Sequence, residues 1–63
     1  MSMTFAEAKV KAKTEGVKIR HQHFTDDEFF EYKNGKLVCE NGYNMSTWYK
    51  GEEWQDSPWY VCE

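Results

Sequence analysis

Two Asn-Gly dipeptides, Asn34-Gly35 and Asn41-Gly42, lie seven residues apart and constrain the fold more than any other feature of the chain. Asn-Gly between runs of strand-forming residues favours the two-residue type I′ turn of a β-hairpin. Two such turns at this spacing predict three antiparallel strands, the middle one being residues 36–40. The central part of the chain is therefore expected to form a small antiparallel sheet.

The two turns also predict which residues face each other across the sheet. The first turn places Tyr32 opposite Leu37 and Phe30 opposite Cys39, which gives one apolar sheet face. The second turn is expected to place Met45 opposite Val38 and Tyr43 opposite Glu40. The other face, where Glu31 is paired with Val38, is mixed in character and is a candidate contact surface.

Residues 4–16, TFAEAKVKAKTEG, are predicted to form one helix. Thr4 followed three residues later by Glu7 is a capping-box pattern, and Gly16 suits the left-handed residue that ends a helix. Three small or aromatic residues share one face: Phe5, Ala8 and Ala12. This thin apolar stripe favours close packing of the helix on a sheet.

Two further strands are expected outside the hairpins. Residues 17–20, VKIR, alternate apolar and charged side chains, so Lys18 and Arg20 lie on the polar face. Residues 59–63, WYVCE, follow a turn at Asp56-Ser57-Pro58, and residues 46–55 are expected to be a loop or a single helical turn. The predicted fold is α+β, a single domain over residues 1–63 with one N-terminal helix packed on a small antiparallel sheet of hairpins.

A chain of 63 residues buries a small core, which commonly needs a disulfide, a metal or self-association for stability. No apolar stretch resembles a signal peptide, so Cys39 and Cys62 are interpreted as reduced thiols rather than as a bridge. Together with His21 and His23 they lack the paired short spacings of zinc sites, so no metal and no cofactor are expected. Self-association into a homo-oligomer is the favoured remaining source of stability.

Charge and aromatic content restrict the partners. A net charge of −3 argues against binding long DNA or RNA, whose recognition depends on clustered Lys and Arg. The absence of a long apolar run argues against a membrane span. Eleven aromatic residues are more than so small a core can easily enclose, so some are expected at an interface or stacked on a ligand.

Residues 17–24, VKIRHQHF, concentrate cationic and imidazole groups in an otherwise acidic chain. Arg20 can bind a phosphate through its guanidinium fork, with further donors from Lys18, His21 and His23. Flat apolar groups for stacking on bases are expected from five aromatic residues: Phe24, Tyr43, Trp48, Tyr49 and Trp54. The alternative interpretations are a surface salt bridge for Arg20, plain solvent exposure for the histidines, and a core position for Phe24. Trp59 is assigned to the core.

Catalysis is not indicated by the sequence. Asp26, Asp27 and Glu28 follow the histidines, but three adjacent acids after a Thr favour a helix start or an exposed turn. No nucleophile beside a base and no Gly-rich phosphate loop occurs. No catalytic residue is therefore assigned, and the chain is expected not to be an enzyme.

The order of these motifs resembles a known family. Its usual opening is Met-Thr/Asn-Phe-x-x-Ala, a helix, Gly-Lys-x-Val-x-Arg and then a Trp. The matching positions are Met3, Thr4, Phe5, Ala8, Gly16, Lys18, Ile19, Arg20 and Phe24. FFEYKNGKLVCENG is similar to its aromatic hairpin, and DSPWYVCE to its closing strand through Asp56, Trp59 and Val61. The chain thus resembles the small phage proteins of the Thoeris anti-defence and anti-CBASS sponge family. It departs from them at Phe24, where Trp is common, and in a shorter segment before the final strand.

The resemblance implies a phage-encoded homo-oligomer, often a tetramer, in the cytoplasm of the infected bacterial host. It implies binding of a cyclic dinucleotide or a cyclic ADP-ribose isomer without cleavage, which starves a bacterial immune effector of its activator. The alternative from another class is a small protein-binding inhibitor of a host defence protein. A structural phage component is a third possibility that the sequence leaves open.

Overall fold

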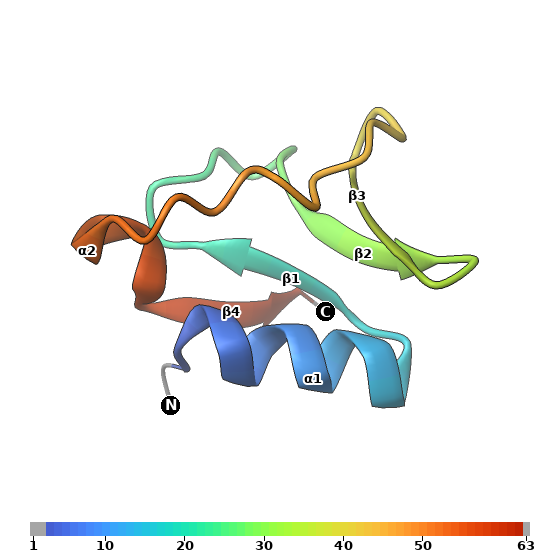
Figure 1. Ribbon diagram of the computed structural model, residues 1–63, viewed down its shortest axis with the longest axis horizontal. Helices are drawn as coiled ribbons and strands as arrows, with labels where there is room; N and C mark the ends of the chain where they lie inside the picture. Colours follow the sequence, from blue (N-terminus) through green and yellow to red (C-terminus); the bar gives the residue numbers. More distant parts are fainter. Residues whose placement is uncertain (1–2, 63) are drawn as a thin grey trace.

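An N-terminal helix packs on a four-stranded antiparallel sheet in the computed structural model, which describes residues 3–62 (Figure 1). The elements are α1 (Phe5–Glu15), β1 (Lys18–His21), β2 (Phe30–Lys33), β3 (Lys36–Cys39), α2 (Glu53–Asp56) and β4 (Trp59–Cys62). The strand order is β3-β2-β1-β4, with antiparallel pairing throughout. The predicted α+β class and the helix-on-sheet arrangement are confirmed.

Helix α1 begins and ends where the capping signals predict. The Glu7 amide donates to the Thr4 hydroxyl at 3.2 Å, and the Thr4 amide donates back to the Glu7 carboxylate at 2.9 Å. Gly16 has a φ of 68° and donates its amide to the Ala12 carbonyl at 3.0 Å. These local bonds satisfy backbone groups that a helix end leaves unpaired. The capping residues thus fix the helix bounds.

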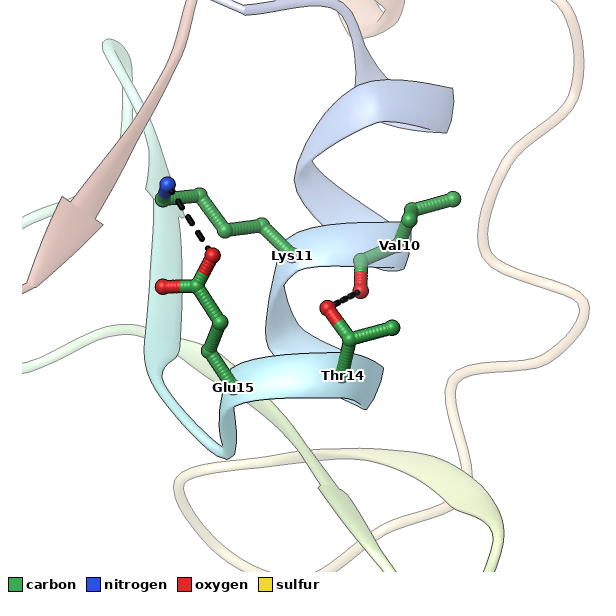
Figure 2. A network of polar contacts seen from close by, with 4 residues as sticks. All are labelled: Val10, Lys11, Thr14 and Glu15. Atoms are coloured by element: carbon green, nitrogen blue, oxygen red, sulfur yellow. Dashed lines mark hydrogen bonds and ion pairs between the residues drawn. The ribbon is translucent and has the colours of Figure 1, made fainter.

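The exposed side of α1 carries its own polar contacts (Figure 2). The Lys11 ammonium lies 3.3 Å from the Glu15 carboxylate one turn later, and the Thr14 hydroxyl donates to the Val10 carbonyl at 2.8 Å. The Lys11–Glu15 pair adds only about 0.2–0.5 kcal/mol, and a threonine hydroxyl bonded to the carbonyl four residues earlier adds no helix stability. The buried face of α1 therefore provides most of the packing that holds it on the sheet.

The first hairpin has the predicted register. Phe30 lies opposite Cys39, Glu31 opposite Val38 and Tyr32 opposite Leu37. Asn34 and Gly35 both have positive φ, 54° and 78°, as a type I′ turn requires.

The second turn differs from the prediction by one residue. Val38 pairs with Asn44, not with Met45, and the Cys39 amide donates to the Tyr43 carbonyl at 3.0 Å. Only Gly42 of the second Asn-Gly pair has positive φ, 83°, and its amide donates to the Cys39 carbonyl at 2.9 Å. This is the three-residue loop in which a left-handed glycine follows a tight turn. Because a one-residue shift reverses the face of each side chain, Met45 packs against the core.

The core lies between α1, one face of the sheet and residues 45–56. Trp59 of β4 is at its centre, fully buried, with ring centroids 5.0 Å from Phe5 and 5.7 Å from both Phe30 and Trp48. The Trp59 indole N–H donates to the Gln55 carbonyl at 2.8 Å, so its one polar atom is satisfied. The prediction that Trp59 is a core residue is confirmed.

The other sheet face has no helix packed on it within residues 3–62 (Figure 1). The strand registers place Lys18 opposite Cys62 and Arg20 opposite Tyr60 on this open face. Cys39 and Cys62 are free thiols on the two edge strands, β3 and β4. The edge strands are separated by three strand spacings of about 4.7–4.9 Å, which is beyond the reach of a disulfide, so Cys39 and Cys62 of one chain are not bridged to each other.

Residues 46–55 are mostly irregular, and α2 is the single helical turn expected there. Of the helices in residues 3–62, neither α1 nor α2 has the length and apolarity that crossing a bilayer requires.

Candidate functional site

The nine residues predicted to bind a ligand are not brought together in one place. Lys18 and Arg20 lie on the open face of the sheet. Phe24 and Trp48 pack against the core on the opposite side, and Tyr43 lies in the second turn with 67% of its surface exposed. Of the other four, three are exposed and His21 is buried; the exposed ones are His23, Tyr49 and Trp54. A single pocket formed by all of them is therefore excluded within one copy of the chain.

His21 is buried, which corrects its expected role as a surface donor. It follows Ile19 by two residues in β1, and both side chains point into the core. The His21 ring packs edge-on against Trp59 and Trp54, with centroids 5.3 and 5.6 Å away, and its Nδ1 accepts the His23 amide at 3.1 Å. The alternation that places Arg20 outside also places His21 inside, so the signal was present in the sequence.

Arg20 makes the surface salt bridge that was its alternative interpretation. Its Nη1 lies 3.5 Å from the Asp26 carboxylate, across the turn that connects β1 to β2. Asp26 and Asp27 are exposed residues of this turn and do not begin a helix.

A different hollow, of about 430 Å³, lies between α1, the β2–β3 hairpin and residues 44–49. It is called the lysine hollow here. Its lining residues are Phe5, Lys9, Tyr32, Gly35, Lys36, Leu37, Asn44, Met45, Ser46 and Tyr49. Its volume falls within the range of about 300–1,000 Å³ that is usual for small-molecule sites.

Aromatic rings and positive charge meet at the lysine hollow. Tyr49 stacks on Phe5, with ring centroids 4.8 Å apart and planes inclined by 20°. The Lys9 ammonium lies 4.8 Å from the centre of the Phe5 ring. Both charged lining residues, Lys9 and Lys36, are cationic although the whole chain has a net charge of −3. A local positive charge in an acidic protein favours an anionic ligand with a flat apolar part.

The buried side chain of Gln55 holds the segment that carries Tyr49. Its amide nitrogen donates to the Trp48 carbonyl at 3.0 Å, and its oxygen accepts the Lys50 amide at 2.9 Å and the Glu52 amide at 3.3 Å. These bonds fix the backbone on both sides of Tyr49, so Gln55 positions one wall of the hollow.

Sequence reasoning proposed only Tyr49 of the ten lining residues as a ligand-binding residue; it missed the other nine, Lys9, Tyr32 and Lys36 among them, and it missed the positioning residue Gln55. Lys9 follows Phe5 by four residues on one helix face, which is a readable signal. The sequence contains no signal for the role of Gln55, because its hydrogen-bond partners are backbone groups of residues 48–52, whose path the sequence does not predict.

Partial burial raises the pKa of the Tyr49 phenol above its ordinary value of 10.0, and the Asp56 carboxylate, which accepts its O–H at 3.3 Å, raises it further. The Cys62 pKa is also raised, chiefly by burial, although Arg20 and Lys18 lower it in part. In both cases the unfolded chain loses its proton at lower pH than the folded chain. The stability that these groups contribute is therefore present below their ordinary pKa values and is lost as the pH rises through the folded ones.

We expect the urea midpoint of unfolding to fall with pH less steeply in Tyr49→Phe than in the parent protein, in buffers above about pH 9. The physical reason is that phenylalanine has no proton to lose. Tyr43→Phe is the matched control, because it removes the same hydroxyl from a side chain that is 67% exposed. Equal slopes in all three proteins would contradict the prediction.

Among residues 3–62, no three His, Cys, Asp or Glu side chains are grouped closely enough to hold a metal ion. Comparison of the chain with protein-family models, with curated proteins and with solved structures finds no match.

Proposed function

We propose that this protein is a nucleotide sponge: it binds a cyclic dinucleotide or a cyclic ADP-ribose isomer and keeps the signal from a bacterial immune effector. The observation that carries the proposal is the lysine hollow, in which Lys9 and Lys36 are the charged residues and Phe5, Tyr32 and Tyr49 supply rings. The resemblance to the phage anti-defence family adds the biological setting, the cytoplasm of the infected host.

The chemistry of the hollow matches the parts of such a ligand. A phosphate accepts charge-assisted hydrogen bonds from lysine ammonium groups. A base stacks on tyrosine, a contact worth about 1–3 kcal/mol per base. The Asn44 and Ser46 side chains can hydrogen-bond the edge of a base or a ribose hydroxyl.

Storage of the intact ligand, rather than its cleavage, is supported by the lining. Its ten residues include no carboxylate, imidazole or thiol from the described part of the chain. Carboxylates, imidazoles and thiols are the commonest bases and nucleophiles, and the Ser46 hydroxyl has none of them beside it in the lining to take its proton. Self-association is part of the proposal because a chain of 63 residues has a small core, and a tetramer is the form that the family resemblance implies.

The test is calorimetry against a panel of cyclic dinucleotides and cyclic ADP-ribose isomers. We expect one class to bind with a defined stoichiometry, and the ligand released by heating the protein to be chemically intact. Absence of binding across the panel would refute the sponge, and release of a cleaved product would identify an enzyme. Sedimentation velocity on the same sample measures the oligomer.

Exposed aromatic side chains favour the second candidate, an inhibitor that binds a host defence protein. Tyr43 is 67% exposed and Trp54 47% exposed, and aromatic residues are enriched at protein interfaces. Excess absorbance near 260 nm that is lost on denaturation and filtration would favour the sponge. A host protein that co-purifies through Tyr43 and Trp54, without nucleotide, would favour the inhibitor.

A further inference from the structure

A second hollow lies on the open face of the sheet, on the opposite side from α1. It has a volume of about 370 Å³ and is lined by Arg20, Asp26, Tyr60, Val61 and Cys62. The β1–β4 register creates it, because Arg20 faces Tyr60 and Lys18 faces Cys62 on the same side of the sheet. It is called the arginine hollow here, and it shares no lining residue with the lysine hollow.

Arg20 has donors to spare in this hollow. Its Nε is enclosed, out of reach of solvent and without a hydrogen-bond partner among the described residues. Of the terminal nitrogens, which an anion can reach, only Nη1 makes a bond within this part of the chain, a long one of 3.5 Å with Asp26. A guanidinium carries five N–H donors arranged for planar oxyanions. The Asp26 side chain is 98% exposed, so its attraction for Arg20 is largely screened by water. An incoming anion can therefore replace Asp26 at little cost.

Lys18 adds a second positive charge on the same face of the sheet, although it does not line the hollow. Its ammonium lies 4.5 Å from the centre of the Phe29 ring, and Lys18 precedes Arg20 by two residues in β1. Burial raises the pKa of the Cys62 thiol, and the charges of Arg20 and Lys18 lower it in part, so both cations lie close enough to act on this thiol. Tyr60, 38% exposed, offers a phenol hydroxyl next to Arg20. A lining guanidinium, a phenol hydroxyl, one replaceable carboxylate and a neighbouring ammonium are together suited to a compact oxyanion.

We propose that the arginine hollow is a separate binding site for a phosphate-type oxyanion, in which the anion replaces Asp26 on Arg20. The site is independent of the proposed sponge function. One copy of the chain then binds anions on two opposite faces, at the lysine hollow and at the arginine hollow.

The test is titration of the folded protein with inorganic phosphate at constant ionic strength, followed by nuclear magnetic resonance. Arg20 is the only arginine in the sequence, so its Nε–H signal is unambiguous. We expect a saturable shift of this signal and of the Tyr60 and Val61 amides. Arg20→Gln should weaken the amide response by about tenfold or more, as loss of a charge-assisted donor predicts.

Asp26→Asn separates site binding from a general charge effect. Removing the competing carboxylate should tighten phosphate several-fold, whereas the matched control Asp27→Asn changes the net charge equally and should not. Equal effects of the two substitutions, a shift that does not saturate, or a response unchanged in Arg20→Gln would overturn the proposal.

A second arm with adenosine monophosphate identifies the source of the oxyanion. If phosphate and adenosine monophosphate shift the Tyr60 and Val61 amides with equal titration midpoints, the site recognises the phosphate group only and not the nucleoside attached to it. A tighter midpoint for the nucleotide would assign it to a phosphate carried by a larger ligand. Because the lysine hollow is intact in Arg20→Gln, a failure of this proposal leaves binding of cyclic nucleotides unaffected.

Discussion

Trp59→Ala is expected to leave the protein largely unfolded at room temperature. Trp59 is fully buried and packs against aromatic rings from α1, β2 and residues 21–24 as well as Trp48. Truncation of a buried tryptophan to alanine costs about 3–5 kcal/mol. A domain of 63 residues has a total stability of about 3–9 kcal/mol at the usual 0.05–0.15 kcal/mol per residue. The loss is therefore comparable with the whole stability.

Circular dichroism during urea denaturation measures this effect. Trp54→Ala is the matched control, because it removes the same side chain from a position that is 47% exposed, and it should keep a cooperative transition with a modestly lower midpoint. A parent-like midpoint for Trp59→Ala would show that the core does not depend on this ring.

The parts of the fold that the sequence predicts are those that depend on local signals. The Thr4 and Gly16 caps fixed α1, and Asn34-Gly35 fixed the β2–β3 register, because neighbouring backbone groups satisfy one another in each case. Asn41-Gly42 was misjudged because the same dipeptide also fits a three-residue loop, in which Asn41 keeps negative φ. Local composition does not separate the two loops; packing of Met45 against the core does.

The candidate sites were harder to predict because they join distant segments. The lysine hollow combines residue 9 of α1 with residues 32–37 and 44–49, and no spacing in the sequence brings these together. The basic stretch at residues 17–24 suggested one site, but strand alternation divides it: Arg20 lies on the open face and His21 lies in the core. Cationic and imidazole side chains that are neighbours in the sequence thus lie on opposite faces of the sheet.

Lys9→Glu is expected to weaken binding of the tightest-binding panel nucleotide about 100-fold, since a charge-assisted contact worth about 1.5–3 kcal/mol is replaced by repulsion. The ammonium that lies 4.8 Å from the Phe5 ring is lost, and a carboxylate enters a hollow whose other charged lining residue is Lys36. Calorimetry at fixed ionic strength measures the change.

Lys13→Glu is the matched control, with the same change of charge on the exposed side of the same helix. Lys13→Glu removes a cation from the last turn of α1, which costs about 0.3–1 kcal/mol of helix stability. Lys9→Glu instead places a glutamate four residues before Lys13, the order in which such an ion pair stabilises a helix best. Loss of the Lys9–Phe5 contact costs a similar amount, about 0.5–1 kcal/mol, so the two variants are expected to have similar stability and only the control to bind like the parent. If both variants lost affinity equally, the cause would be net charge, and the lysine hollow would not be the nucleotide site. If only Lys9→Glu lost affinity, and urea denaturation gave the two variants similar midpoints, instability could not be the explanation.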